Sequence, residues 1–90
     1  MDLTILQNTE KHQFETTVDG HTAFIVYKLF PGGIAYIHTE VPPELEGKGI
    51  ASQMAKYVLD YARENHLKVK PLCPYVHAYM KRHPEYNDLL

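Results

Sequence analysis

The sequence predicts a single α+β domain over residues 1–90, with the element order ββββ-α-β-α. The first half of the chain alternates apolar and polar residues with a period of two and is divided by glycine and proline turns, as antiparallel strands are. From Ile50 onward the apolar residues recur with a period of 3.6, which is typical of an amphipathic helix. Ninety residues supply only one hydrophobic core. We therefore expect an antiparallel meander joined to a parallel βαβ unit.

Three segments supply strands of the meander. Residues 14–18 precede an Asp-Gly pair that favours a hairpin turn. Residues 21–30 carry apolar side chains on both faces, so we expect an interior strand whose middle is covered on both sides. Residues 34–41 alternate again, so that one face carries Ile34, Tyr36, His38 and Glu40 and the other carries Ala35, Ile37, Thr39 and Val41.

The second half of the chain predicts a helix, a strand and a second helix. The apolar stripe begins at Ile50, and the first helix should end near Asn65. The short extended segment 67–72 follows this crossover helix, so we expect it to lie parallel to the strand at 34–41. Pro74 suits the first position of a second helix, which Pro84 ends.

Composition excludes several classes of function. The formal net charge is −2 and Lys and Arg are not clustered, which argues against a nucleic-acid binder. Cys73 is the one cysteine, so no intramolecular disulfide or cysteine-rich zinc site can form, and the histidine spacings match no metal motif. No segment has the ~18 consecutive apolar residues of a membrane span, and the N-terminus lacks a signal-peptide pattern. These observations predict a cytoplasmic protein.

A glycine-containing loop stands between the expected strand and helix, with the sequence Glu46-Gly47-Lys48-Gly49-Ile50-Ala51. A helix whose first amides lack a capping side chain offers free N–H groups and a positive dipole end, which together bind phosphate. Glycines let a ligand approach the backbone, and Lys48 adds a positive charge. A simple tight turn remains the alternative, because neither the dinucleotide nor the P-loop fingerprint is present.

The segment EGKGIASQMAKYVLDYARENHLKVKPLCPYVHAYMKRHPEY resembles the acyl-CoA-binding core of the GNAT superfamily of N-acetyltransferases, in its small stand-alone branch. The resemblance covers roughly residues 12–90. It implies that loop amides hold the pyrophosphate of coenzyme A, with Gly49 at the family's glycine and Ala51 at the last motif position. Glu46 replaces the family's Gln or Arg, so we expect it to point away and leave binding to the amides from Gly47 to Ala51.

His38 and Cys73 are the candidate catalytic residues. They lie toward the ends of two strands expected to be parallel neighbours, where ligands bind in α/β units. Cys73 also precedes the Pro74 helix, whose dipole favours a thiolate. The resemblance implies that the two strands splay around the acyl group, so that His38 and Cys73 could face each other across it. Glu40, ~7 Å along the strand from His38, is a reserve base or a partner that orients the imidazole, and the favoured alternative is a solvated carboxylate without a catalytic role.

Two mechanisms and three functions remain open. Either His38 deprotonates an amine while Cys73 protonates the departing thiolate, or Cys73 is acylated first. The resemblance implies an acetyl-CoA-dependent N-acetyltransferase with an unidentified amine acceptor, which is either a protein or a small molecule. The alternatives are a coenzyme A-binding module without turnover and a protein-interaction domain. We expect a monomer or a weak homodimer, because one sheet edge is exposed.

Overall fold

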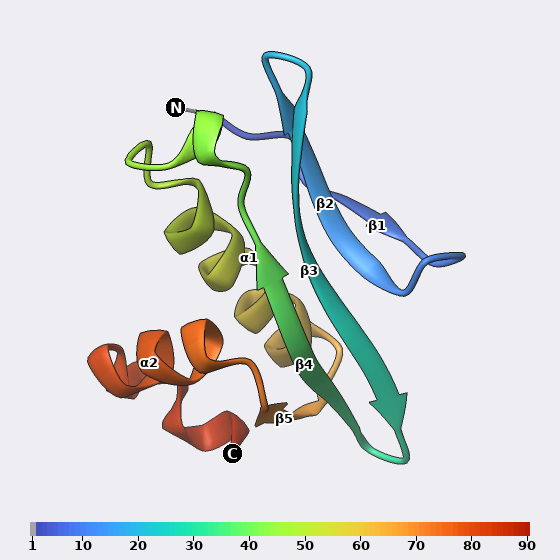
Figure 1. Ribbon diagram of the computed structural model, residues 1–90. Coiled ribbons are helices and arrows are strands. Elements are labelled where there is room, and N and C mark those ends of the chain that lie inside the picture. Colours follow the sequence, from blue (N-terminus) through green and yellow to red (C-terminus); the bar gives the residue numbers. More distant parts are fainter. Residues whose placement is uncertain (1) are drawn as a thin grey trace.

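The computed structural model describes residues 2–90, which form one mixed β-sheet with two α-helices packed on a single face (Figure 1). The strands run in the spatial order β1-β2-β3-β4-β5. Their bounds are Leu6–Asn8 (β1), Gln13–Val18 (β2), His21–Phe30 (β3), Gly33–Glu40 (β4) and Lys68–Pro71 (β5). The helices are Ile50–Glu64 (α1) and Pro74–Arg82 (α2), with 3₁₀ helices at Pro43–Leu45 (η1) and Pro84–Leu89 (η2).

This architecture confirms the predicted fold class. Strands β1 to β4 form an antiparallel meander, and β5 pairs with β4 in parallel after the crossover through α1. Helix α1 begins at Ile50 and ends at Glu64, and α2 begins at Pro74 and ends two residues before Pro84, as the periodicity and the prolines indicated. The short β1 and the 3₁₀ helix η2 are additions that the sequence did not locate.

The core lies between the two helices and the face of the sheet that they cover, which we call the inner face. Helix α1 buries the apolar stripe that its sequence predicted, except for Ala51, which is half-buried; the buried members are Ile50, Met54, Ala55, Val58, Leu59 and Ala62. The sheet contributes fully buried Phe14, Ile25, Ile34 and Tyr36. The hydroxyl of Tyr36 donates a hydrogen bond to the carbonyl of Val58 in α1, 2.5 Å away. Burying apolar area in this single layer is the main source of stability.

Among the described residues, no helix packs on the opposite face of the sheet, which we call the outer face (Figure 1). The expectation that β3 is covered on both sides is therefore wrong. Ala23, Ile25 and Tyr27 are buried on the inner face, but Phe24 and Val26 on the outer face are only half-buried. Both helices pack on one side, so the outer apolar residues are shielded only by their neighbours in the sheet.

Within residues 2–90, none of the helices is long and apolar enough to cross a membrane.

Candidate functional site

The glycine loop ends in an uncapped helix. Gly49 is the N-cap of α1 with a left-handed φ of 73°, and no side chain caps the helix. The first helical hydrogen bond runs from the amide of Gln53 to the carbonyl of Gly49, so the amides before Gln53 have no partner one turn back. A Cβ added at Gly47 or Gly49 would meet no atom within 4 Å. The loop therefore presents amides to open space, as the sequence predicted.

A hollow of about 230 Å³ adjoins these amides. Its lining comes from four segments that the fold brings together: the residue after β4, the end of η1, the glycine loop with the start of α1, and the first turn of α2. The residues that bound it are Val41, Leu45, Glu46, Gly47, Gly49, Ile50, Ala51, Ser52 and Tyr75. Every residue of the predicted phosphate cradle except Lys48 lines this hollow.

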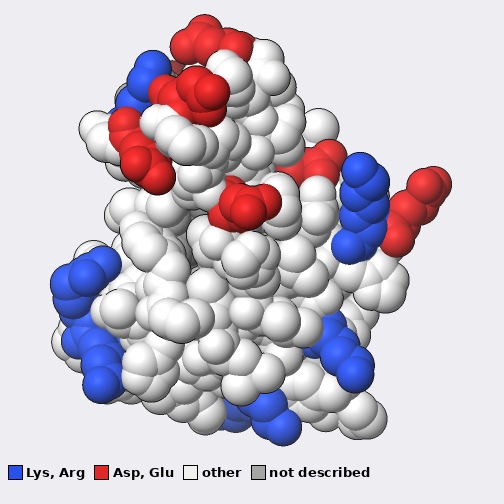
Figure 2. Space-filling view, in the orientation of Figure 1, with Lys and Arg blue, Asp and Glu red and all other residues white. Residues whose placement is uncertain are grey.

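The charges around the loop are mostly negative. Lys48 is exposed, and its ammonium lies 3.9 Å from the carboxylate of Asp19 in the turn between β2 and β3. Glu44 approaches His21 at 3.8 Å. Figure 2 shows acidic side chains gathered at the end of the molecule where β4 ends and α1 begins, while basic side chains lie mainly toward the other end. Any anion bound here depends chiefly on backbone amides rather than on free cations.

A β-bulge in β4 changes which side chains enter the site. Tyr36 pairs with Tyr27 of β3, but the next pair is His38 with Val26, so Ile37 is an extra residue without a partner. Beyond the bulge the alternation is inverted. His38 lies on the outer face, where its ring is 6.3 Å from that of Phe24, and Thr39 takes the inner position opposite Ile25.

The expectation that His38 shares a face with Ile34 and Tyr36, and could face Cys73, is therefore wrong. Strict period-two alternation assigned His38 to the inner face, and one inserted residue reverses that assignment. His38 and Glu40 do share a face, as the sequence predicted, but it is the outer one.

Cys73 is a buried free thiol held at three points. Its sulfur lies 3.1 Å from the hydroxyl oxygen of Thr39, and its amide donates to the carbonyl of Tyr36 at 2.8 Å. Its own carbonyl accepts a hydrogen bond from the amide of His77 in the first turn of α2, at 3.0 Å. The sequence analysis did not identify Thr39 as the residue that contacts the Cys73 sulfur. The one feature of the sequence that could have indicated it is that Thr39 is a polar residue next to His38.

The pairing between strands β4 and β5 ends just before the contact between Thr39 and Cys73. Their parallel pairing ends at Tyr36 with Pro71, and the bond from the Cys73 amide to Tyr36 is the last link between them. The backbone of β4 beyond Tyr36 has no strand partner on that side among residues 2–90. The pairing of β4 with β5 therefore ends next to the Thr39–Cys73 contact.

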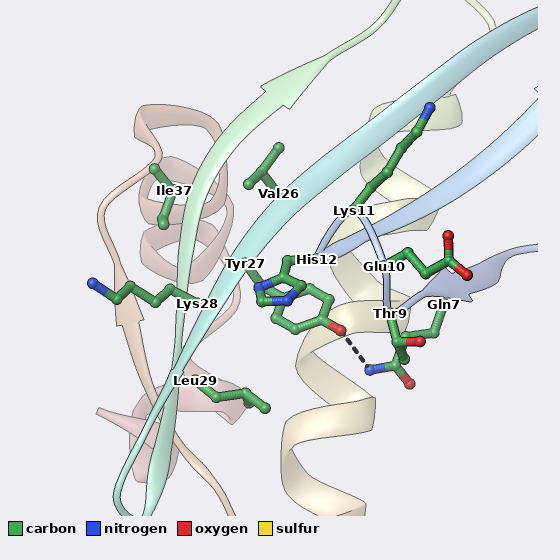
Figure 3. Close-up of a pocket in the computed structure, with 10 residues that line it drawn as sticks. All are labelled: Gln7, Thr9, Glu10, Lys11, His12, Val26, Tyr27, Lys28, Leu29 and Ile37. Carbon is green, nitrogen blue, oxygen red and sulfur yellow. Dashed lines mark hydrogen bonds between the residues drawn. The ribbon is translucent and has the colours of Figure 1, made fainter.

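A larger hollow lies elsewhere, at the turn between β1 and β2 (Figure 3). It measures about 710 Å³ and contains none of the predicted site residues. The hydroxyl of Tyr27 accepts a hydrogen bond from the Gln7 amide at 3.0 Å in its wall, and the His12 ring stacks on Tyr27. It touches β4 only through the bulge residue Ile37. The volume of a hollow alone therefore does not identify the candidate functional site in this protein.

Among the described residues, no group of three or more His, Cys, Asp or Glu side chains is arranged to hold a metal ion.

Comparisons with known proteins relate this chain to one family. A family model described as GCN5-related N-acetyl-transferase matches residues 13–89. Protein NATD1 of Mus musculus is 35% identical over 78 residues, covering 83% of this chain and 71% of that protein. Protein NATD1 of Homo sapiens is 35% identical over 77 residues, covering 82% and 68%. Protein NATD1 of Danio rerio is 29% identical over 91 residues, covering 96% and 83%.

Proposed function

Because this chain belongs to the GCN5-related N-acetyltransferase family, we propose that it binds acetyl-CoA at the glycine loop and transfers the acetyl group to an amine. The observation that carries the proposal is the uncapped start of α1, which opens onto a hollow built from the loop, β4 and α2. Amides at a helix N-terminus and the helix dipole suit a pyrophosphate. The open space above Gly47 and Gly49 gives it room.

In this proposal, His38 and Cys73 carry out the two proton transfers that acetyl transfer requires. Bound acetyl-CoA supplies an activated acetyl group on a thioester. Transfer joins the amine nitrogen to the acetyl carbon and breaks the carbon–sulfur bond, so one proton must leave the nitrogen and one must reach the departing sulfur. His38 accepts the first proton, and the Cys73 thiol donates the second. Since the two side chains lie on different faces of the sheet, they act from opposite sides of the point beyond Tyr36 where β4 and β5 no longer pair.

Thr39 orients the Cys73 sulfur in this scheme. A hydroxyl 3.1 Å from the sulfur can accept the S–H hydrogen bond and can donate to the thiolate after the proton has left. The same contact serves the version in which Cys73 attacks the acetyl carbon first and releases coenzyme A. Mass spectrometry after mixing with acetyl-CoA separates the two routes, because only the second leaves an acetyl group on Cys73.

Ligand-induced thermal stabilisation tests the binding step. Acetyl-CoA at 100-fold over its Kd should add about 2.7 kcal/mol to the free energy of unfolding, which raises Tm by roughly 10 °C or more in a domain of this size. Gly49→Glu should abolish that increase. Gly32→Glu is the matched control, because Gly32 has a similar φ of 79°, also faces open space, and lies in the turn between β3 and β4.

Both glycine variants should lose similar stability from backbone strain, and only the Gly49 variant should lose the response to acetyl-CoA. No increase in the Tm of the wild-type protein at millimolar acetyl-CoA would refute the proposal.

A second candidate function, coenzyme A binding without turnover, is favoured by Glu46 at the loop and by the ion pair of Lys48 with Asp19. Stabilisation by acetyl-CoA with no release of free coenzyme A in the presence of varied amines would support this second candidate.

A further inference from the structure

Strand β3 extends beyond the strand beside it, so its last residues have one open edge. The pairing of β2 with β3 ends at Gln13 with Val26, while β3 continues to Phe30. Residues 27–30 pair with β4 on one side. On the other side, no strand lies along them among residues 2–90. The sheet therefore has a notch beyond the end of β2.

One hydrogen bond shows which backbone groups face this notch. The amide of Tyr27 donates to the carbonyl of His12 at 2.9 Å, so the backbone polar groups of Tyr27 point toward the β2 side. Successive residues of a strand point these groups to opposite edges, so the N–H and C=O of Leu29 also point to that side. Within residues 2–90, Leu29 has no backbone partner there. Unpaired groups at a sheet edge are a template for another strand.

The turn between β1 and β2 keeps the notch open. His12 has a left-handed φ of 53°, which is uncommon for a residue other than glycine, and the chain leaves the line of β2 at this point. The turn is held by a hydrogen bond from the Lys11 amide to the Asn8 side chain at 3.1 Å. Gln7 fixes it further through its bond to the Tyr27 hydroxyl. The notch is therefore built into the fold.

The hollow of about 710 Å³ at this turn coincides with the notch (Figure 3). It is lined by Lys11 and His12 of the turn and by residues 26–29 of β3. Apolar side chains are exposed in it, since Leu29 is 58% exposed and Ile37 is 41% exposed. Unpaired backbone groups beside pockets for alternate side chains are the features with which a sheet edge binds an extended peptide.

The charges around the notch favour acidic residues in such a peptide. Lys11 and Lys28 are exposed, and neither makes an ion pair with any other residue between 2 and 90. Figure 3 shows their side chains on opposite sides of the hollow. Glu10 is the one acidic residue of the lining, so positive charge predominates. An acidic residue opposite Lys28 in an added strand forms a favourable cross-strand pair, and an apolar residue suits the position opposite Leu29.

We propose that the notch binds an extended segment of another protein, with alternating acidic and apolar residues, as an added strand beside β3. A second copy of this chain fits less well, because pairing two identical edges brings lysines beside lysines. The inference goes beyond the proposed function and does not rest on it, since no residue lines both this hollow and the hollow at the glycine loop.

The probe is the synthetic peptide acetyl-(Val-Glu)₃-amide, titrated into ¹⁵N-labelled protein at low salt. The amides of residues 27–30 and of the β1–β2 turn should shift, and those of Gly47 to Ala51 should not. Lys28→Glu should weaken binding about threefold to tenfold, because it replaces an exposed attraction by a repulsion. Lys81→Glu is the matched control, since Lys81 is an exposed lysine on α2. It should leave the Kd unchanged.

Methylated peptides test strand addition without changing the protein. The valine and glutamate N–H groups of an extended peptide point to opposite edges, so only one of the two sets can face β3. N-methylation of the facing set should abolish the amide shifts, and N-methylation of the other set should preserve them. Equal losses from both methylated peptides would show that the peptide does not add as a strand, and the inference would be wrong.

The remaining outcomes also decide the question. No shift at residues 27–30 with millimolar peptide, or equal weakening by Lys28→Glu and Lys81→Glu, would refute the inference. Shifts at residues 27–30 that grow with protein concentration in the absence of peptide would assign the edge to a second copy. Equal shifts with glutarate alone would assign the hollow to a small dicarboxylate. Either of these last two results would overturn the proposal.

Discussion

The two halves of β4 have opposite characters although they belong to one eight-residue strand. From Gly33 to Tyr36 the strand is buried and paired on both sides, with β3 and with β5. From Ile37 to Glu40 it is mostly exposed and has lost its pairing with β5. The bulge at Ile37 divides them. The first half contributes to the stability of the domain through its buried side chains. The second half places Thr39 on the inner face and His38 on the outer face. The stabilising residues and the candidate site residues therefore lie in adjacent segments of one strand.

The largest difference in stability between the two halves is expected for alanine substitutions at two isoleucines of β4, Ile34 and Ile37. Ile34→Ala should cost about 2–5 kcal/mol, because the side chain is fully buried and its removal leaves a cavity. Ile37→Ala should cost at most about 1 kcal/mol, because Ile37 is 41% exposed. Chemical denaturation of both variants measures the difference. Equal losses would remove the distinction between the two halves.

Tyr36 allows the first half to be tested by alkaline titration. Burial, followed by the neighbouring Tyr61 and Tyr27, raises the pKa of Tyr36 above its ordinary value of 10. A raised folded-state pKa gives stability that is complete below pH 10 and is lost as the pH rises, because the unfolded chain ionises first. Above pH 10, the free energy of unfolding should therefore fall by about 1.4 kcal/mol per pH unit for this group.

Tyr36→Phe should cost about 1 kcal/mol at neutral pH through the lost hydrogen bond to Val58, and it should flatten the alkaline decline. Tyr86, whose pKa is also raised by burial and by its hydrogen bond to Asp60, keeps part of the decline in the variant. An unchanged alkaline slope in Tyr36→Phe would show that the Tyr36 hydroxyl does not titrate in this way.

A substitution at Thr39 tests the role of the second half of β4, and its expected effect on stability is smaller than that of Ile34→Ala. Thr39→Val keeps the shape of the side chain and removes the hydroxyl beside Cys73. We expect a loss of about 0.5–1.5 kcal/mol in stability and alkylation of Cys73 by iodoacetamide that is about threefold to tenfold slower, because the thiolate loses its donor. Thr39→Ser should restore most of the rate.

Thr17→Val is the control for Thr39, because it breaks an exposed threonine pair with Thr22 on β2 and β3. It should not alter the alkylation rate. If Thr39→Val reacts at the wild-type rate, or if Thr39→Ser fails to restore it, Thr39 does not orient the thiol.

The sequence was sufficient for the parts of this fold that follow regular periods. The stripe from Ile50 to Ala62 predicted α1 and its buried face, and the prolines at 74 and 84 bounded α2. The loop with glycines at 47 and 49 predicted an uncapped helix start, and among the described residues no side chain forms a capping hydrogen bond at the start of α1. The proposed role of the loop in phosphate binding stays a prediction.

The bulge could not be predicted, because residues 34–41 alternate without a visible break. Only the pairing with β3 shows that Ile37 has no partner. That single residue moved His38 away from Cys73 and brought Thr39 to it. The absence of any layer on the outer face was equally hidden, since Phe24 and Val26 look like core residues in the sequence alone. Tertiary packing decides which side of an apolar strand is covered.

An NMR titration of ¹⁵N-labelled protein with acetyl-CoA tests the central claim most directly, because it reports where the ligand binds. We expect the largest amide shifts from Gly47 to Ser52 at the start of α1, with smaller shifts at Thr39 and Cys73. The amide signals of Gln7 and Leu29, at the larger hollow, should not shift. Shifts centred on that larger hollow, with the glycine loop unaffected, would show that acetyl-CoA does not bind at the start of α1.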